Sequence, residues 1–400
     1  MQDISSNYLH MNADRITALC YNDIKYPLLQ YERNFMSNTS IRENRASGIF
    51  KTAGAFIAWC IGSGFSTGQE ILQFFTSFGW LGYGGLFITL IGYIAIGNML
   101  INIGYTHKDD ETFNHFSYYC GKRLGKFYSW LVPLLMIPTM AVLISGAAAT
   151  FKESYHLPSP AGGLFMAALV LVSFLIGFEK FVGIASKIGP VLIIFVITIS
   201  LISCIANIDN MSNVSSYIPE LGRYHAAPNW ILSGVLYVSL TFINGSVYYV
   251  ELGKGRTSKK EIFLGATLGA AAIITAIFFM NTALLLQGDK IAGLNIPNLY
   301  LANGISYIFG FAFSIILLMG IFSACSIMFW TVCRNFKFKS EKIQKISPFL
   351  LALLLYTFSL FSFGELLGIV YPIIGYIGII FTVCLIFKTI KNRKNDPASD

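Results

Sequence analysis

The residues with the clearest chemical potential lie in one otherwise apolar stretch near the N-terminus, 54–70. Three glycines, Gly62, Gly64 and Gly68, occur there among small hydroxyl residues, and Glu70 follows directly. Glycine weakens a helix, and serine or threonine hydroxyls can bond to backbone groups that a helix has freed. The stretch therefore predicts a helix that is interrupted over 62–66.

An unwound segment here would expose backbone groups that can bind a ligand. Its N–H groups, with the positive end of the following half-helix, suit a carboxylate or another anion. We therefore expect Gly62, Ser63, Gly64 and Phe65 to contact a substrate. The alternative interpretation is close helix packing, because the spacing of Gly64 and Gly68 is also common where membrane helices touch.

A cation could bind on the other side of this break. The carbonyls of Ala58 and Ile61 precede it, and Ser323 and Ser326 share one side of a later apolar helix. Two carbonyls and two hydroxyls would suit Na⁺, which prefers oxygen ligands. The alternative is hydrogen bonding between helices, which is common for buried serine and is favoured by the residues alone.

A second interrupted stretch, 229–252, lies much later in the chain. Small and polar residues break its apolar pattern at a depth that matches the first break. Paired interruptions in corresponding spans are the best sequence indication of a transporter binding site. The expected substrate contacts from this stretch are Ser239, Thr241, Phe242 and Asn244.

Two ionisable residues are candidates for coupling, Glu70 and Lys187. A carboxylate inside a membrane costs about 3 kcal/mol on insertion scales, so such residues are usually functional. Glu70 is predicted to be a proton-coupling site, a gate partner or a substrate contact; the alternative is a vestibule residue in contact with water. Lys187 is either a charged anchor on the cytoplasmic side or an ammonium that occupies a cation site.

The elements that carry these residues must cross a membrane. Of the 400 residues 55% are hydrophobic and 12% are charged, and the mean hydropathy is +0.63. Soluble domains carry about 25% charged residues, and one membrane helix needs about 20 apolar residues. We predict an all-α integral membrane protein with about ten spans. The predicted spans are 51–76, 79–105, 125–151, 161–179, 184–206, 229–252, 261–287, 299–333, 346–364 and 366–388.

The distribution of charge predicts the topology. With the N-terminus inside, only Lys152, Arg223 and Lys290 of the 28 lysines and arginines fall in outer loops. This positive-inside pattern predicts a plasma-membrane protein with both termini in the cytoplasm. The net charge of +8 is thus a topology signal and does not indicate nucleic-acid binding.

Domain boundaries follow from the same pattern. We predict a cytoplasmic tail over 1–48, a membrane domain over 49–390 and a second tail over 391–400. The membrane domain divides into halves at 51–206 and 229–388. Because each half has an odd number of spans, the two halves must be inverted relative to each other.

The first interrupted stretch resembles a known family. The sequence GSGFSTGQEILQFF over 62–75 is similar to the first-span signature of the YkvI-like uncharacterised membrane proteins. These are placed in the amino acid–polyamine–organocation superfamily, with the LeuT fold of five-plus-five inverted repeats and broken helices 1 and 6. The resemblance implies an alternating-access carrier whose substrate binds at the two breaks.

The resemblance also bears on the coupling ion. In sodium-coupled relatives, carbonyls before the first break and hydroxyls on span eight form a cation site, which maps here to Ala58, Ile61 and Ser323. Relatives often carry two adjacent hydroxyls on span eight, whereas Ala324 follows Ser323 in this chain. Proton coupling through Glu70 or Lys187 therefore stands beside sodium coupling.

The predicted function is a Na⁺- or H⁺-coupled symporter of a small organic solute, such as an amino acid or a related compound. Its expected partners are that solute and the lipid bilayer, with no nucleic acid and no cofactor other than a coupling Na⁺. A non-transporting sensor and a membrane-embedded enzyme are the alternatives. Residues 64–68 match the GxSxG pattern formally, but no predicted span contains the histidine that such a nucleophile needs. We therefore do not expect an enzyme.

Overall fold

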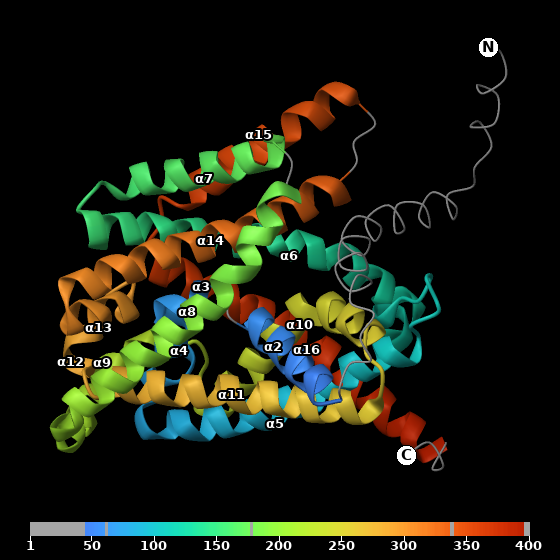
Figure 1. Cartoon of the computed structure of the whole chain (residues 1–400), viewed down its shortest axis with the longest axis horizontal. Coiled ribbons are helices and arrows are strands. Elements are labelled where there is room, and N and C mark those ends of the chain that lie inside the picture. The colour runs from blue at the N-terminus through green and yellow to red at the C-terminus, as the bar shows by residue number, and fades with distance from the viewer. Residues whose placement is uncertain (1–44, 61–62, 177–178, 337–339, 396–400) are drawn as a thin grey trace.

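The computed structural model describes residues 45–60, 63–176, 179–336 and 340–395, and within these ranges it is helical and contains no strand (Figure 1). The first-half helices are α2 (Arg45–Cys60), α3 (Ser63–Thr67), α4 (Gln69–Phe74), α5 (Gly82–Thr106), α6 (His115–Tyr155), α7 (Ser159–Ile176), α8 (Glu179–Ala206) and α9 (Val214–Leu221). The second-half helices are α10 (Trp230–Lys254), α11 (Lys259–Leu285), α12 (Gly288–Ile291), α13 (Pro297–Ile305), α14 (Tyr307–Asn335), α15 (Glu341–Phe358) and α16 (Phe363–Asn395). Short 3₁₀ helices cover Thr76–Leu81, Ile208–Asn213 and Gly222–Tyr224.

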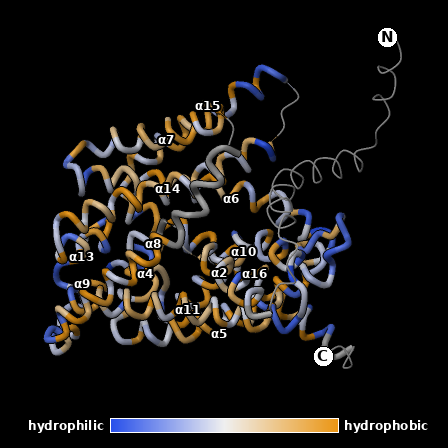
Figure 2. The backbone as a smooth tube through the Cα atoms, in the orientation of Figure 1, coloured by the Kyte–Doolittle hydropathy of each residue, from blue (hydrophilic) through white to orange (hydrophobic). Residues whose placement is uncertain are grey.

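The helices have the lengths and composition of membrane spans. In the described part of the chain, seven are long and apolar enough to cross a bilayer, namely α5 with its preceding 3₁₀ turn, α6, α7, α10, α11, α14 and α16. The other three predicted spans are the broken unit α2–α4, helix α8, and α15, whose first turns are charged. In Figure 2 hydrophobic residues fill the middle of the long helices and hydrophilic residues gather at their ends. This confirms the predicted all-α, multi-pass membrane fold.

Helix contacts repeat with a shift of five predicted spans. Helix α2 packs on α11, and its counterpart α10 packs on α5. Helix α6 packs on α16, and in the same way α14 packs on α8. Each half therefore completes its packing with helices of the other half, as a five-plus-five repeat predicts.

The first predicted span is interrupted, but not over the residues that we expected. The described residues 63–66 belong to helix α3, Ser63–Thr67, and the break falls at Gly68 before α4. Gly68 has φ +82°, a left-handed conformation that favours glycine. An interruption of this span is thus confirmed, and its predicted position over 62–66 is corrected to Gly68; Gly62 lies outside the described residues.

The sixth predicted span is not interrupted, which corrects our expectation. Helix α10 runs without a break from Trp230 to Lys254, capped at its start by the Asn229 side chain. The hydroxyls of Thr241 and Ser246 donate to carbonyls of their own helix, at 2.9 and 3.2 Å, so they release no backbone group. The residues that suggested unwinding serve the helix and its packing instead.

Close packing explains the glycines of α10. A β-carbon on Gly245 would collide with the Trp59 indole, and one on Gly253 would collide with the carbonyl of Ile101 in α5. Gly104 of α5 meets the carbonyl of Val250 in the same way. Gly245 thus makes room for the Trp59 side chain of α2, and Gly253 and Gly104 let α10 and α5 touch backbone to backbone, which is the packing alternative that their spacing also allowed.

Candidate functional site

Helix α13 packs against the break in the first span. Gly68 lies against Asn298, and a β-carbon at Gly68 would be 2.7 Å from Asn298 Oδ1. Asn298 Nδ2 donates to the Ser66 carbonyl over 2.9 Å, and the Asn298 side chain is completely buried. The carbonyl that the interrupted helix frees is therefore satisfied by a side chain more than two hundred residues away. Sequence reasoning missed Asn298, whose one local signal is its place beside Pro297 at a helix start.

Glu70 sits in α4, two residues after this corner. It is 8% exposed, and its carboxyl interacts with the Tyr237 hydroxyl of α10. Among residues whose side chains are described, no lysine or arginine pairs with Glu70. Burying a carboxyl in a membrane without a neighbouring cation costs free energy, so the presence of Glu70 at this place points to a function.

Polar side chains of α5 and α10 continue from this carboxyl. The Tyr93 and Tyr237 rings stack at a centroid distance of 6.2 Å, and the Tyr93 hydroxyl lies 2.8 Å from Thr241 Oγ1. Because Thr241 Oγ1 donates to the Tyr237 carbonyl at 2.9 Å, it accepts from Tyr93. The result is a buried row of hydroxyls that leads from Glu70 into the interface of α5 and α10.

The end of α2 closes this row on the other side. Cys60 Sγ lies 3.4 Å from the Tyr249 hydroxyl, and Trp59 Nε1 donates to the Thr241 carbonyl over 3.3 Å. Aromatic rings of Phe56 and Phe242 pack between them, with centroids 6.3 Å apart. The candidate site thus combines one carboxyl, several hydroxyls and a wall of aromatic rings.

Two of the eight predicted substrate contacts, Thr241 and Phe242, fall in this site: Thr241 belongs to the hydroxyl row, and Phe242 packs on Phe56 and Tyr93. Phe65 is completely buried in α3. Ser63 and Gly64 are the first residues of α3, while Gly62 lies outside the described residues.

The other two predicted contacts from α10 have different surroundings. Ser239 accepts a hydrogen bond from Thr382 Oγ1 of α16 at 3.3 Å. Asn244 is half-buried about one turn after Thr241, and its buried Oδ1 has no partner in the described part of the chain. Of the four residues predicted from α10, Thr241 and Phe242 contact Tyr93, whose ring stacks on Tyr237.

The proposed sodium ligands are not gathered into one cluster by the described residues. Ser326 Oγ lies 3.1 Å from Ser173 Oγ of α7, which matches the helix-to-helix alternative. Ala58 is exposed on α2, Ser323 is half-buried on α14, and Ile61 lies outside the described residues. Lys187 lies in α8, and its side chain is likewise outside the description.

The site is covered unequally at its two ends. All of α4 is buried, and Gln73 Nε2 donates to the Gly364 carbonyl at the start of α16 over 2.7 Å. Leu236 to Leu240 of α10 are also buried, whereas Asn244 is half-buried and Val247 is 47% exposed in the other half of the same helix. The α4 end of the site is therefore closed by packing.

Comparison with known proteins agrees with this architecture. No family model matches the chain. It is 24% identical over 362 residues to the uncharacterised membrane protein YkvI of Bacillus subtilis (strain 168), covering 86% of this chain and 96% of YkvI. It is 23% identical over 337 residues to the uncharacterised protein YyaD of the same organism, covering 83% and 94%. The resemblance first seen at 62–75 therefore extends over most of the chain.

A solved structure shares the fold. A mutant of the manganese transporter of Eremococcus coleocola superposes with a TM-score of 0.54 at 13% identity, covering 85% of this chain and 79% of that one. The chain thus has a LeuT-like fold of two five-helix halves. Manganese is the cargo of that transporter; in the described part of this chain no three His, Cys, Asp or Glu residues are grouped as metal ligands.

Proposed function

We propose that this protein is a secondary active transporter, coupled to protons through Glu70, that moves a small organic solute by alternating access. The observation that carries the proposal is the placement of a buried carboxyl beside the break of the first span, against hydroxyls of the other half. Sites of this kind lie near the midplane, between repeats, in transporters with inverted halves.

The environment of Glu70 favours proton coupling over sodium coupling. A carboxyl among apolar rings and hydroxyls can be neutralised by one proton without further ligands, whereas Na⁺ requires a set of oxygen atoms. Ser326, one of the expected sodium ligands, is engaged with Ser173. A sodium site from the Ala58 and Ile61 carbonyls with Ser323 remains the second candidate.

The substrate that fits this site best is an amino acid or a related compound. The N–H groups at the start of a helix segment suit a carboxylate, and Glu70 with Tyr237 suits an amino group. Phe65, Thr241 and Phe242 would form the wall around the side chain. This assignment matches the amino acid–polyamine–organocation superfamily, a plasma-membrane location and cytoplasmic termini.

Uptake into proteoliposomes tests the proposal. A panel of amino acids and related amines is offered with an inward proton gradient, an inward Na⁺ gradient or neither. We expect uptake of at least one solute with the proton gradient, and its loss in Glu70→Gln. Glu365→Gln is the matched control, because Glu365 is exposed on α16.

Two results would oppose the proposal. Gradient-driven uptake that persists in Glu70→Gln would remove this residue from the coupling step. Solute binding to well-folded protein without any flux would instead support the sensor on a carrier scaffold.

A further inference from the structure

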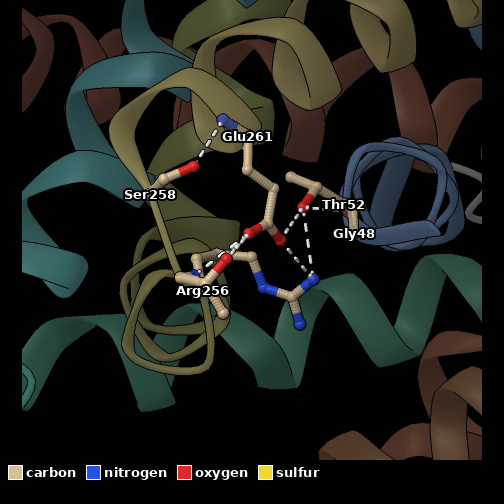
Figure 3. Close-up of polar contacts among 6 residues, drawn as sticks. Gly48, Thr52, Arg256, Ser258 and Glu261 are labelled. Atoms are coloured by element: carbon tan, nitrogen blue, oxygen red, sulfur yellow. Dashed lines mark hydrogen bonds and ion pairs between the residues drawn. The ribbon is translucent and has the colours of Figure 1, made fainter. Parts of the chain in front are cut away.

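A compact polar cluster joins the start of α2 to the connection between α10 and α11 (Figure 3). Its centre is the Glu261 carboxylate. Thr257 donates to Glu261 Oε2 from its N–H at 3.0 Å and from its hydroxyl at 2.6 Å, and Arg256 Nη1 lies 3.3 Å from Glu261 Oε1. The ion pair is buried, with side-chain exposures of 5% for Arg256 and 6% for Glu261.

Thr52 brings α2 into this ion pair. Its hydroxyl accepts from Arg256 Nη1 at 3.2 Å and shares its proton between Glu261 Oε1 at 3.3 Å and the Gly48 carbonyl at 2.9 Å. The Thr52 side chain is completely buried. One hydroxyl of α2 therefore contacts both charges at the start of α11.

Glycines extend the contact along both helices. A β-carbon on Gly48 would lie 2.8 Å from Glu261 Cδ, and one on Gly265 would lie 2.5 Å from Thr52 Cβ. One turn further, a β-carbon on Gly269 would lie 3.0 Å from the Ala53 carbonyl. The backbone of α2 thus lies directly on α11 for more than two turns.

The other half of the first span is held by several helices. Gln73 of α4 donates to the Gly364 carbonyl of α16, and Asn298 of α13 donates to the Ser66 carbonyl. Thr76, just after α4, donates to Asn281 Oδ1 of α11 at 2.8 Å. The α2 side of the break is therefore attached to α11 through the Thr52 cluster, while the α4 side is shared among α11, α13 and α16.

We propose that Thr52, Arg256 and Glu261 form a latch that makes α2 and α11 one rigid body. Removing one partner of a buried ion pair is strongly destabilising, so these contacts resist separation of α2 from α11. During transport α2 then moves together with α11 and does not swing away from it. The joint movement of α2 and α11 during transport rests on the proposed function, whereas the attachment of α2 to α11 does not.

Distances between spin labels test the latch without any substrate. Labels are placed at Phe50→Cys on α2 and Phe263→Cys on α11, which are 72% and 56% exposed, in a background without native cysteines and in lipid nanodiscs. We expect one narrow distance at pH 6 and pH 8, with and without Na⁺. In Thr52→Val a second, longer distance should appear, and Thr52→Ser should restore the single one.

Control labels at Ile91→Cys on α5 and Leu268→Cys on α11 report the integrity of the fold, and their distance should be the same in every variant. Two distances in the protein with Thr52 intact would overturn the proposal, because α2 would then separate despite the latch. A Thr52→Val protein with the same narrow distance as its parent would overturn it too. Glu261→Gln provides a second variant, with the same longer distance expected.

Discussion

The hydroxyl of Tyr93 donates a hydrogen bond to Thr241 Oγ1 over 2.8 Å and thereby joins α5 to α10. This bond lies one helical turn from Tyr237, whose hydroxyl faces Glu70. Neither helix is interrupted at this bond. The polar interior of the candidate site is therefore built from side chains of continuous helices, and α2–α4 supplies the interrupted backbone.

Removing the hydroxyl that faces the carboxyl tests this arrangement. Tyr237→Phe keeps the buried ring but leaves Glu70 without that partner. A hydrogen bond to a charged group contributes about 1.5–3 kcal/mol, so proton-driven uptake should fall by about tenfold or more. Tyr376→Phe is the control, because Tyr376 is 45% exposed on α16. Equal uptake by both variants would show that Tyr237 does not assist Glu70.

The left-handed corner of the first span should not tolerate a side chain. Gly68→Ala places a β-carbon at φ +82° and 2.7 Å from Asn298 Oδ1. A non-glycine residue in this region costs about 1–3 kcal/mol, before the collision is counted. The melting temperature in detergent should fall clearly. Gly54→Ala is the matched control, since its β-carbon would meet nothing within 4 Å; a similar loss in both would contradict the special role of Gly68.

The contact between Asn298 and Ser66 should determine how rigid the break is. Asn298→Ala leaves the buried Ser66 carbonyl unpaired, which costs about 1–3 kcal/mol. Amide hydrogen exchange in 63–74 should therefore accelerate. Asn213→Ala serves as control, because the exposed Asn213 side chain makes no capping hydrogen bond to α9, the helix that follows it. Unchanged exchange in Asn298→Ala would mean that the corner holds its shape without α13.

Because Ser326 is hydrogen-bonded to Ser173, we expect alanine substitutions at either residue to lower the stability without changing the response of the protein to Na⁺. Each serine-to-alanine change should cost less than about 1 kcal/mol, and the double mutant should show a coupling near 0.6 kcal/mol. Na⁺ should shift the melting temperature of Ser326→Ala as much as that of its parent. A Na⁺ effect that disappears in Ser326→Ala but persists in Ser173→Ala would restore the sodium site.

The break in the first span was predictable, whereas the course of the sixth was not. Gly62, Gly64 and Gly68 are dense enough to weaken a helix, and the described structure is interrupted at Gly68. In α10 the same residue types allow close contacts with neighbouring helices, as at Gly245 against the Trp59 side chain and Gly253 against the Ile101 carbonyl. One sequence cannot distinguish these uses, because glycine serves both close packing and unwinding.

Most of the remaining site depends on contacts between distant residues. Glu70 was predicted from its burial in an apolar stretch, because an ionisable residue there is rare. Tyr93 and Tyr237 gave no comparable signal in a chain with 21 tyrosines, and only folding brings them beside Glu70. Asn298 was missed for the same reason, since its partner Ser66 lies in the other half.

Gly104 and Gly253 bring the backbones of α5 and α10 together near one end of the two helices, and Gly85 and Gly234 do so near the other end. Two rods that touch at both ends can neither slide lengthwise past each other nor turn about one contact without a collision. We therefore expect α5 and α10 to behave as one stiff pair. A methyl group at Gly104 or Gly253 would push the two backbones apart, and its effect should reach the other end of the pair.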